Sequence, residues 1–214
     1  MIFVYPYKRK AFDFLISHSI RLVKHHYPQA EIVIIGDQYG KHKYIPFKDS
    51  YSLRGANVTA KLLHIAKLYP EFIFMNDDFL INSTFDFNKH HKHTEPLMRR
   101  EGKASIEWNT AVDNTKDYLK HLKKPIMCYE NHQPLLIESH KLLNIFNDIE
   151  WSKHAHFIKS LYCNIYPKKN ITIDNCKLIR PDIKKANMLY QMGCLSIGDG
   201  FQTTQGSNYI KALI

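Results

Sequence analysis

The sequence predicts an α/β fold in which helices flank a mostly parallel sheet. Short, mostly apolar runs occur at residues 2–5, 31–35 and 72–75, and the second is rich in β-branched residues, as in strands that are buried on both faces. Between these runs, apolar residues recur at helical spacing. The chain has 214 residues, of which 44% are hydrophobic and 23% are charged, so it is long enough for one domain with an ordinary core.

The first forty residues are expected to form a strand, a helix and a second strand. The strand at Ile2–Tyr5 should end at Pro6, because proline cannot donate a ladder hydrogen bond. A helix of about fourteen residues follows and should end before Pro28, since the residue before a proline disfavours helical geometry. The second strand is expected at Glu31–Ile35, a nearly continuous apolar run.

The next forty residues repeat this alternation. A helix is expected at Asn57–Leu68 and a third strand at Phe72–Met75. Strands that alternate with helices are joined by right-handed crossovers and pair in parallel. The pattern therefore predicts a parallel sheet whose strands have their carboxyl ends at one edge.

The second part of the chain carries weaker signals. Residues 85–125 are polar and basic, which favours loop or lid structure, and the histidine-rich run Lys89–His93 is expected to be solvated. Apolar residues at helical spacing predict helices at Pro134–Phe146 and His156–Tyr166. The glycine-containing segment 198–206 predicts a flexible tail.

Charge composition favours a polyanionic partner. Thirty Lys and Arg against twenty Asp and Glu give a formal net charge of +10, and eight of the basic residues lie in residues 151–185. Such a balance is typical of proteins that bind nucleic acid, anionic membrane surfaces or phosphorylated small molecules. A solvated basic surface is the alternative interpretation.

Composition also excludes several classes of protein. No apolar run approaches the roughly 18 residues of a membrane span, and the N-terminus MIFVYPYKRK lacks signal-peptide anatomy. No CxxC pair occurs, so neither a zinc ribbon nor a disulfide framework is expected for the four cysteines, which are Cys128, Cys163, Cys176 and Cys194. We therefore expect a cytoplasmic protein that does not bind membranes.

The strongest chemical motif is the run Asn76, Asp77 and Asp78 directly after the third predicted strand. Ligands of open α/β sheets bind at the carboxyl ends of the strands. Two adjacent carboxylates repel each other unless a cation compensates, and Mg²⁺ or Mn²⁺ binds oxygen ligands and bridges to phosphate oxygens. The motif therefore predicts a divalent metal that holds a diphosphate. A turn cap beside an exposed aspartate is the alternative.

Residues 1–82 resemble the nucleotide-binding part of glycosyltransferases with the A-type fold. The similarity is carried by the segments VYPYKR, QAEIVIIGD, RGANVTAKLLHIA and FIFMNDDFLI. The resemblance implies that Asp37, just after the second strand, touches the nucleotide base. It also implies that Asp78 is the first metal ligand and Asp77 the second, although the chain has NDD where a plain DxD is usual.

This resemblance implies a site for a nucleotide-sugar donor with Mn²⁺ or Mg²⁺ as cofactor. A histidine from the second half, His154 or His156, would complete the metal shell. We expect a single domain over residues 1–214, in which residues 1–82 bind the donor and residues 83–214 face the acceptor. The candidate donor-binding residues are Pro6, Lys8, Arg9, Asp37, Arg54, Asn57, Lys61 and Asn76.

Sugar transfer with inversion requires a base that removes the proton of the acceptor hydroxyl. His132 is the first candidate, and Glu130, Glu138 and Asp77 are the others. A retaining transfer needs no dedicated base, so the stereochemistry stays open. The basic charge points to nucleic acid as an acceptor, such as a hydroxymethylated base in bacteriophage DNA.

A narrower similarity is to the Stealth family of sugar-phosphate transferases. It is carried by Met75–Asp78, by His132-Gln133-Pro134, and by His154 or His156, while the opening block of that family is absent. Three functions therefore remain open. They are metal-dependent glycosyl transfer, Stealth-like transfer of a sugar 1-phosphate to a glycan, and non-catalytic binding of nucleic acid by a basic protein.

Overall fold

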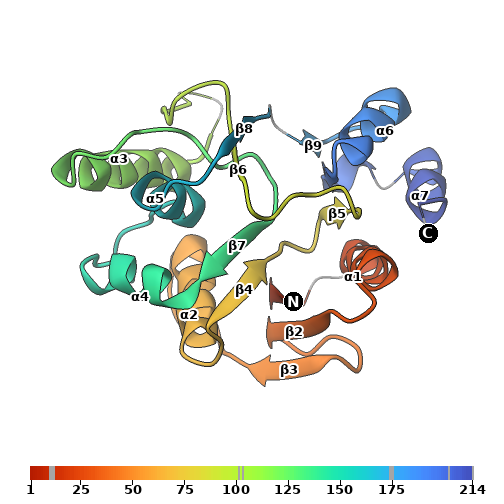
Figure 1. Ribbon diagram of the computed structural model, residues 1–214, viewed down its shortest axis with the longest axis horizontal. Coiled ribbons are helices and arrows are strands. Elements are labelled where there is room, and N and C mark those ends of the chain that lie inside the picture. The colour runs from red at the N-terminus through yellow and green to blue at the C-terminus, as the bar shows by residue number, and fades with distance from the viewer. Residues whose placement is uncertain (10–12, 101, 103, 174–175, 202, 214) are drawn as a thin grey trace.

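A central five-stranded sheet organises the chain (Figure 1). The structure, a computed structural model, describes residues 1–9, 13–100, 102, 104–173, 176–201 and 203–213. The sheet has the order β3-β2-β1-β4-β7, with the first four strands parallel and β7 antiparallel to β4. Its strands are β1 (Ile2–Tyr7), β2 (Glu31–Gly36), β3 (Lys43–Pro46), β4 (Glu71–Phe74) and β7 (Leu135–Glu138). The predicted α/β class is thereby confirmed.

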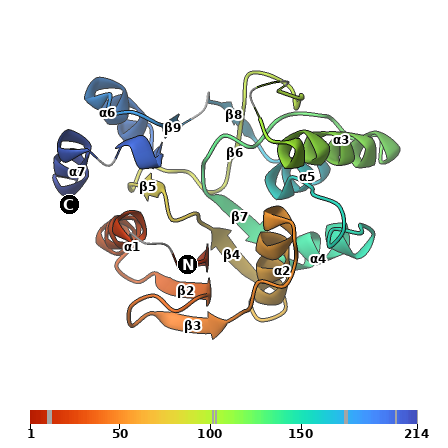
Figure 2. The same cartoon turned by 180° about the vertical axis from the view of Figure 1, so that it is seen from behind.

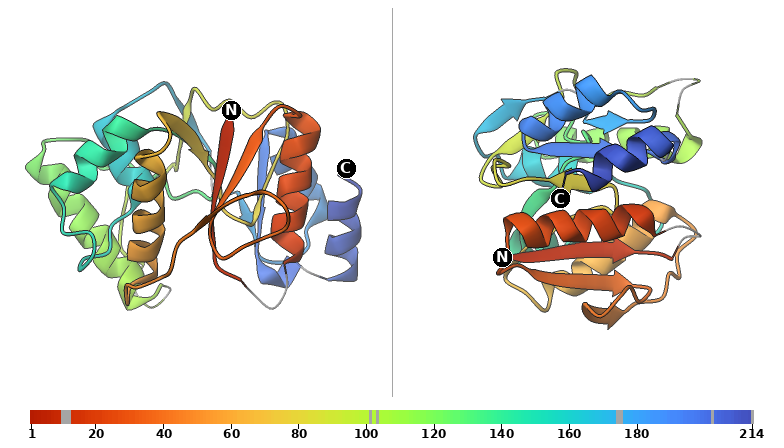
Figure 3. Two further views of the ribbon diagram at one scale, coloured as in Figure 1. Left: turned by 90° about the horizontal axis from the view of Figure 1, so that it is seen from below. Right: turned by 90° about the vertical axis from the view of Figure 1, so that its right-hand side faces the viewer.

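Two helices cover opposite faces of this sheet, α1 (Phe14–His26) on one side and α2 (Arg54–Ala66) on the other (Figure 3). Alternate residues of β1 point to the two faces, as the period of a strand requires. Phe3 and Tyr5 pack in the cluster that contains α1, whereas Val4 packs in the cluster that contains α2. The two predicted helices are confirmed, with α2 beginning three residues earlier than expected.

The predicted end of β1 at Tyr5 is wrong, because the strand continues through Pro6 to Tyr7. The carbonyl of Val4 accepts a hydrogen bond from the Met75 amide, so Val4 and Pro6 direct their backbone groups toward β4. Pairing between β1 and β4 stops at Val4. Pro6 therefore occupies a central strand without removing a ladder bond.

A second, smaller layer lies on the far side of α1 (Figure 1, Figure 2). It contains the sheet β5-β10-β9, with α6 (Ile183–Gln191), the short 3-10 helix η1 (Asp199–Phe201) and α7 (Thr204–Lys211) beside it. The three strands are β5 (Phe79–Ile81), β9 (Lys177–Leu178) and β10 (Cys194–Ile197). Leu15 and Leu22 of α1 pack against this layer, so α1 is buried between two sheets.

Three expectations for the second half are wrong. The segment predicted as a loop contains β6 (His90–Lys92) and α3 (Ile106–His121), whose N-cap Ser105 accepts a hydrogen bond from the Trp108 amide at 3.1 Å. The helix predicted at Pro134–Phe146 is β7 followed by α4 (Ser139–Asn147), since residues 135–138 pair with the open edge of β4. The predicted flexible tail contains η1 and α7, with Gln202 outside the described residues.

Of the remaining elements, a helix agrees with the prediction from the sequence and a strand was not predicted. The helix expected at His156–Tyr166 is α5 (Ile158–Ile165), and β8 (Asn170–Thr172) pairs in parallel with β6. All four cysteines are buried free thiols. Within the described ranges, no helix combines the length and apolarity that crossing a membrane requires.

His90 and His91 are buried, so the expectation of a solvated histidine run is wrong for these two residues. Their exposed fractions are 1% and 9%. Parallel pairing of β6 with β8 draws them under the ring of Tyr129 and beside Phe85. Burial is the main reason that the pKa of each imidazole is lowered to about 4, so both rings are neutral at pH 7.

Candidate functional site

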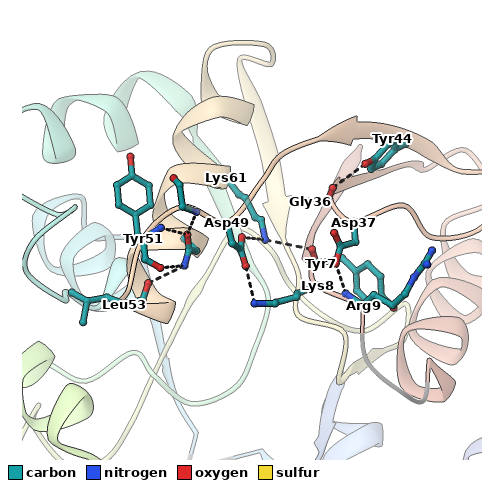
Figure 4. A network of polar contacts seen from close by, with 12 residues as sticks. Tyr7, Lys8, Arg9, Gly36, Asp37, Tyr44, Asp49, Tyr51, Leu53 and Lys61 are labelled. Carbon is teal, nitrogen blue, oxygen red and sulfur yellow. Dashed lines mark hydrogen bonds and ion pairs between the residues drawn. The ribbon is translucent and has the colours of Figure 1, made fainter.

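The carboxyl ends of β1, β2 and β3 surround a pocket of about 410 Å³, which we call the strand-end pocket (Figure 4). Parallel pairing brings these ends to one edge of the sheet, where open α/β proteins bind ligands. Its lining residues are Tyr7, Lys8, Gly36, Asp37, Tyr44, Pro46, Phe47, Lys48, Asp49 and Lys61. Three of the predicted donor-binding residues, Lys8, Asp37 and Lys61, therefore lie together.

An ion-pair network forms one side of the strand-end pocket (Figure 4). The ammonium of Lys61, on α2, lies 2.7 Å from Asp49 Oδ1 and donates to the carbonyl of Tyr7 at 3.4 Å. Lys8 Nζ lies 3.6 Å from the other carboxylate oxygen of Asp49. The side chain of Lys61 is 4% exposed and that of Lys8 is 74% exposed, so Lys8 is the cation that a ligand can reach.

Asp37 presents its side chain at the opposite side of the pocket. Its Oδ2 accepts a hydrogen bond from the amide of Arg9 at 2.8 Å, and its own amide donates to the carbonyl of Tyr7 at 3.2 Å. The guanidinium of Arg9 donates to the carbonyl of Gln38 at 3.4 Å. Asp37 remains exposed, which leaves its carboxylate accessible to a nucleoside.

Asn57 bonds to the loop that precedes α2. It is 8% exposed, and its Oδ1 accepts from the amides of Ser50 and Tyr51, each at 3.0 Å. Its Nδ2 donates to the carbonyls of Tyr51 at 2.8 Å and Leu53 at 3.2 Å. These bonds hold the loop before α2, and the predicted direct contact of Asn57 with a donor stays a prediction.

The other predicted donor residues lie around the same edge. Pro6 is half-buried in β1, and Arg54 is exposed at the first position of α2. Asn76 is half-buried after β4, where its carbonyl accepts from the amide of Phe79 at 3.3 Å. Their contacts with a donor stay predictions.

A second group of polar residues, the Asp78 cluster, follows β4. It consists of Asp78, Lys177, Ser196 and His132. Asp78 Oδ2 accepts hydrogen bonds from Ser196 Oγ at 2.9 Å and from Lys177 Nζ at 3.1 Å. The register explains this meeting, because Ser196 pairs with Phe79 on one side and with Lys177 on the other. Asp78 is only 7% exposed.

His132 belongs to this cluster through its electrostatic environment. Burial, and then the positive charge of Lys177, lower its pKa to about 4, while Asp78 acts in the opposite direction. The backbone of His132 has a φ of +56°, an uncommon value for a residue other than glycine. The ammonium of the buried Lys159 donates to the carbonyl of Gln133 and helps to hold this conformation. At pH 7 the imidazole is neutral and can accept a proton.

Glu138 lies at the opposite end of β4 from Asp77 and Asp78, and its predicted role as a base stays a prediction. Because β7 runs antiparallel to β4, Glu138 pairs with Glu71 at the start of β4, whereas Asp77 and Asp78 follow its end. Its carboxylate lies 2.6 Å from Lys141. The sequence placed this residue in a helix, whereas it is the last residue of strand β7.

His154 and His156 lie in the turn before α5. His154 Nε2 is 3.8 Å from Glu150, and His156 Nδ1 is 2.8 Å from the carbonyl of His154. Among the described residues, no three His, Cys, Asp or Glu side chains gather as a group that could hold a metal ion. Neither histidine joins Asp77 and Asp78 in such a group among the described residues, and their predicted role at a metal stays a prediction.

The residues after β4 do not fit a preformed site for Mn²⁺ or Mg²⁺. The Oδ2 atom of Asp78 is already hydrogen-bonded to an ammonium and a hydroxyl, and the carboxylate is largely buried. Asp77 is half-buried beside it, but no third ligating side chain joins the two aspartates in the described part of the chain. We therefore derive no chemical step through a metal.

Comparisons with known proteins define the fold. No protein-family model matches the chain, and no curated protein matches it by sequence. The galactosyltransferase LgtC, solved in complex with donor and acceptor sugar analogues, aligns over 100% of this chain and 95% of its own, with a TM-score of 0.52 and 10% identity. The chain has the A-type glycosyltransferase fold. The predicted A-type fold is thereby confirmed.

Two other solved structures align less well. A glycosyltransferase involved in the glycosylation of the major capsid of PBCV-1 has a TM-score of 0.45 and 12% identity over 98% of both chains. The glycosyltransferase GlyE of Streptococcus pneumoniae TIGR4 has a TM-score of 0.40 and 10% identity, over 82% of this chain and 45% of that one. Within the A-type fold, the strand-end pocket and the Asp78 cluster lie at the edge that the parallel strands share.

Asp49, Lys177 and Ser196 are functional candidates that sequence reasoning missed. Asp49 follows β3, a short edge strand with half-exposed residues that carries little hydrophobic signal. Lys177 lies 99 residues and Ser196 lies 118 residues from Asp78 along the chain, and β9 has only 2 residues. The excess of basic residues at 151–185 was the only signal that included Lys177.

Proposed function

We propose that the protein transfers a sugar from a nucleotide-sugar donor to an acceptor hydroxyl. One observation carries the proposal: the strand-end pocket and the Asp78 cluster both follow the carboxyl ends of neighbouring parallel strands. A fold shared with a galactosyltransferase that was solved with donor and acceptor sugar analogues supports it. The donor would lie mainly on residues 1–82, and the acceptor would face residues 83–214.

The strand-end pocket suits the nucleoside part of the donor. Its volume of about 410 Å³ lies in the range of small-molecule sites. The exposed carboxylate of Asp37 can accept hydrogen bonds from a base or a ribose, and the exposed ammonium of Lys8 can pair with a phosphate. Lys61 supports the pocket, because its ammonium pairs with Asp49 and donates to the carbonyl of Tyr7 at the end of β1.

The Asp78 cluster suits the reacting end of the donor. In the transfer, the bond between the anomeric carbon and the β-phosphate oxygen breaks, and both electrons leave with the nucleoside diphosphate. The acceptor oxygen forms the new bond to the anomeric carbon. For an inverting reaction, the acceptor proton would pass to the neutral imidazole of His132.

A panel of nucleotide sugars tests the proposed function. We expect release of a nucleoside diphosphate from one of UDP-glucose, UDP-galactose, UDP-N-acetylglucosamine and GDP-mannose, with or without Mn²⁺, measured by anion-exchange chromatography. Asp78→Asn should lower the rate by about 100-fold, because the carboxylate of Asp78 holds the ammonium of Lys177, and a fixed positive charge stabilises the charge that develops at the leaving group. Asp117→Asn is the matched control and should leave the rate unchanged, since the Asp117 side chain is 74% exposed on α3.

The products of the same panel separate the other functions. Release of a nucleoside monophosphate would show sugar-phosphate transfer of the Stealth type, and no release from any donor would contradict the proposal. A hydroxymethylated DNA base as acceptor rests on the net charge of +10, and it requires binding to duplex DNA that weakens steeply with salt. DNA binding without any donor turnover would favour the non-catalytic alternative.

A further inference from the structure

We infer that Lys177 contacts the diphosphate of the donor and supplies the positive charge that a divalent metal would otherwise supply. The inference rests on the proposed function and names a residue for the leaving-group end of that site. Its basis is the placement of one cation against the carboxylate of Asp78, at the position where the sequence predicted a metal.

The strand register fixes Lys177 at this position. Lys177 and Ser196 are paired on the neighbouring strands β9 and β10, and both donate to Asp78 Oδ2. A Cβ atom placed on Gly198 would lie 3.4 Å from the Cε atom of Lys177, so the stem of the lysine packs closely along β10. The amide of Gly198 donates to the carbonyl of Leu178 at 2.8 Å and fixes this approach. Lys177 is therefore preorganised by the fold.

Exposure distinguishes the two partners of this ion pair. The side chain of Lys177 is 28% exposed, whereas that of Asp78 is 10% exposed. An anion that approaches the end of β4 meets the lysine before it meets the buried carboxylate. An ammonium is a compact charge with three N–H donors and is suited to phosphate oxygens. The buried carboxylate thus acts to position the cation.

A second positive charge strengthens the local field. Lys159 is 7% exposed, and its ammonium lies 4.7 Å from the centre of the Phe79 ring. Phe79 is the residue that follows Asp78 in the sequence. Both Lys159 and Asp78 act electrostatically on His132, as does Lys177. Glu130 as well as Asp78 acts on Lys159 as an opposite charge, so the positive charge that an anion meets at the surface of the cluster is mainly that of Lys177.

The chemistry needs a cation at this place. When the glycosidic bond of the donor breaks, the β-phosphate oxygen gains the electron pair, and a fixed positive charge lowers the barrier. At Asp78 Oδ2, a divalent metal would compete with the ammonium of Lys177 and the hydroxyl of Ser196. The described residues offer no group of three ligating side chains to receive it. Lys177 is already in place for this task.

Nucleotide binding with and without metal tests the inference. UDP, GDP, CDP and ADP are titrated in turn into the full chain by isothermal titration calorimetry, first in excess EDTA and then with Mn²⁺. We expect one nucleotide to bind in EDTA with an affinity that Mn²⁺ changes by less than about threefold. Lys177→Met should weaken this binding by about 10- to 100-fold, the usual effect of removing a charge-assisted hydrogen bond.

Control variants keep the result interpretable. Lys177→Arg retains the charge and should retain most of the affinity, and Lys184→Met removes an exposed lysine of α6 and should leave the affinity unchanged. Because Lys177→Met alone leaves a buried carboxylate without its cation, the double variant Asp78→Asn/Lys177→Met provides a neutral cluster. It should melt close to the wild-type temperature and still bind weakly.

Some results would reject the inference alone, and another would reject the proposed function as well. Binding that occurs only with Mn²⁺, or that is unchanged in both Lys177→Met and the double variant, rejects the role of Lys177 and keeps the proposed function. No binding of any of the four nucleotides, in EDTA or with Mn²⁺, rejects the proposed function and the inference together.

Discussion

Gly36→Ala is expected to lower the free energy of unfolding by about 3 kcal/mol and to abolish nucleotide binding. Gly36 has a φ of +124°, a value that residues with a Cβ atom rarely adopt. A Cβ atom here would lie 2.1 Å from the carbonyl oxygen of Tyr7 and 3.0 Å from the ammonium of Lys61. The substitution would thus separate β1 from β2 where they form the strand-end pocket.

Gly40→Ala is the matched control, because Gly40 also has a positive φ, +59°, but its nearest neighbour would be the His42 ring at 3.4 Å. This variant should lose only about 1 kcal/mol, the cost of a left-handed backbone for alanine. Urea denaturation of both variants measures the difference. Equal losses in the free energy of unfolding would show that the close approach of Gly36 to the carbonyl of Tyr7 adds nothing to the cost of the substitution.

Lowering the pH from 7 to 5 is expected to destabilise the protein, with His90 contributing on the order of 2 kcal/mol. Its folded pKa is about 4, below the unfolded value of about 6.5. The unfolded chain therefore binds the proton first, and stability that is complete above pH 6.5 is lost as the pH falls toward 4. His90 Nδ1 accepts a hydrogen bond from the Lys168 amide at 3.4 Å, so a second ring proton on Nδ1 would break this bond inside the protein.

His90→Phe isolates this effect, since a phenyl ring keeps most of the packing against Tyr129 and cannot bind a proton. Guanidinium denaturation at pH 7 and pH 5 should show a smaller difference between the two pH values in the variant than in the wild type. An identical difference would mean that His90 is protonated in the folded state without cost.

The parallel core of the fold could be predicted from the sequence because its strands are fully buried. The apolar runs of β1, β2 and β4 have no polar face, and the helices between them have clear apolar stripes. β3 was missed because it is an edge strand with no fully buried residue. β7 was predicted as helix because a four-residue apolar strand runs directly into α4, so the two periodicities merge.

The site was predictable where it depends on neighbours in sequence. Lys8, Asp37 and Asp78 follow strand ends, and a strand end can be read from the chain alone. The partners Asp49 and Lys177 could not be found in this way, because they reach the site through strand pairing that no local pattern specifies. Glu138 illustrates the converse, since an antiparallel strand places it at the other end of the sheet from Asp78, which no local pattern indicates.

Backbone hydrogen exchange, followed by mass spectrometry with and without the nucleoside diphosphate that binds, tests most directly where the donor lies. We expect slower exchange with nucleotide in residues 7–9, 36–38, 47–49 and 76–78, at the carboxyl ends of β1 to β4, and in β9 around Lys177. Protection confined to other surfaces, such as the hollow between α2 and α4 lined by Tyr51 and Trp151, would contradict this placement.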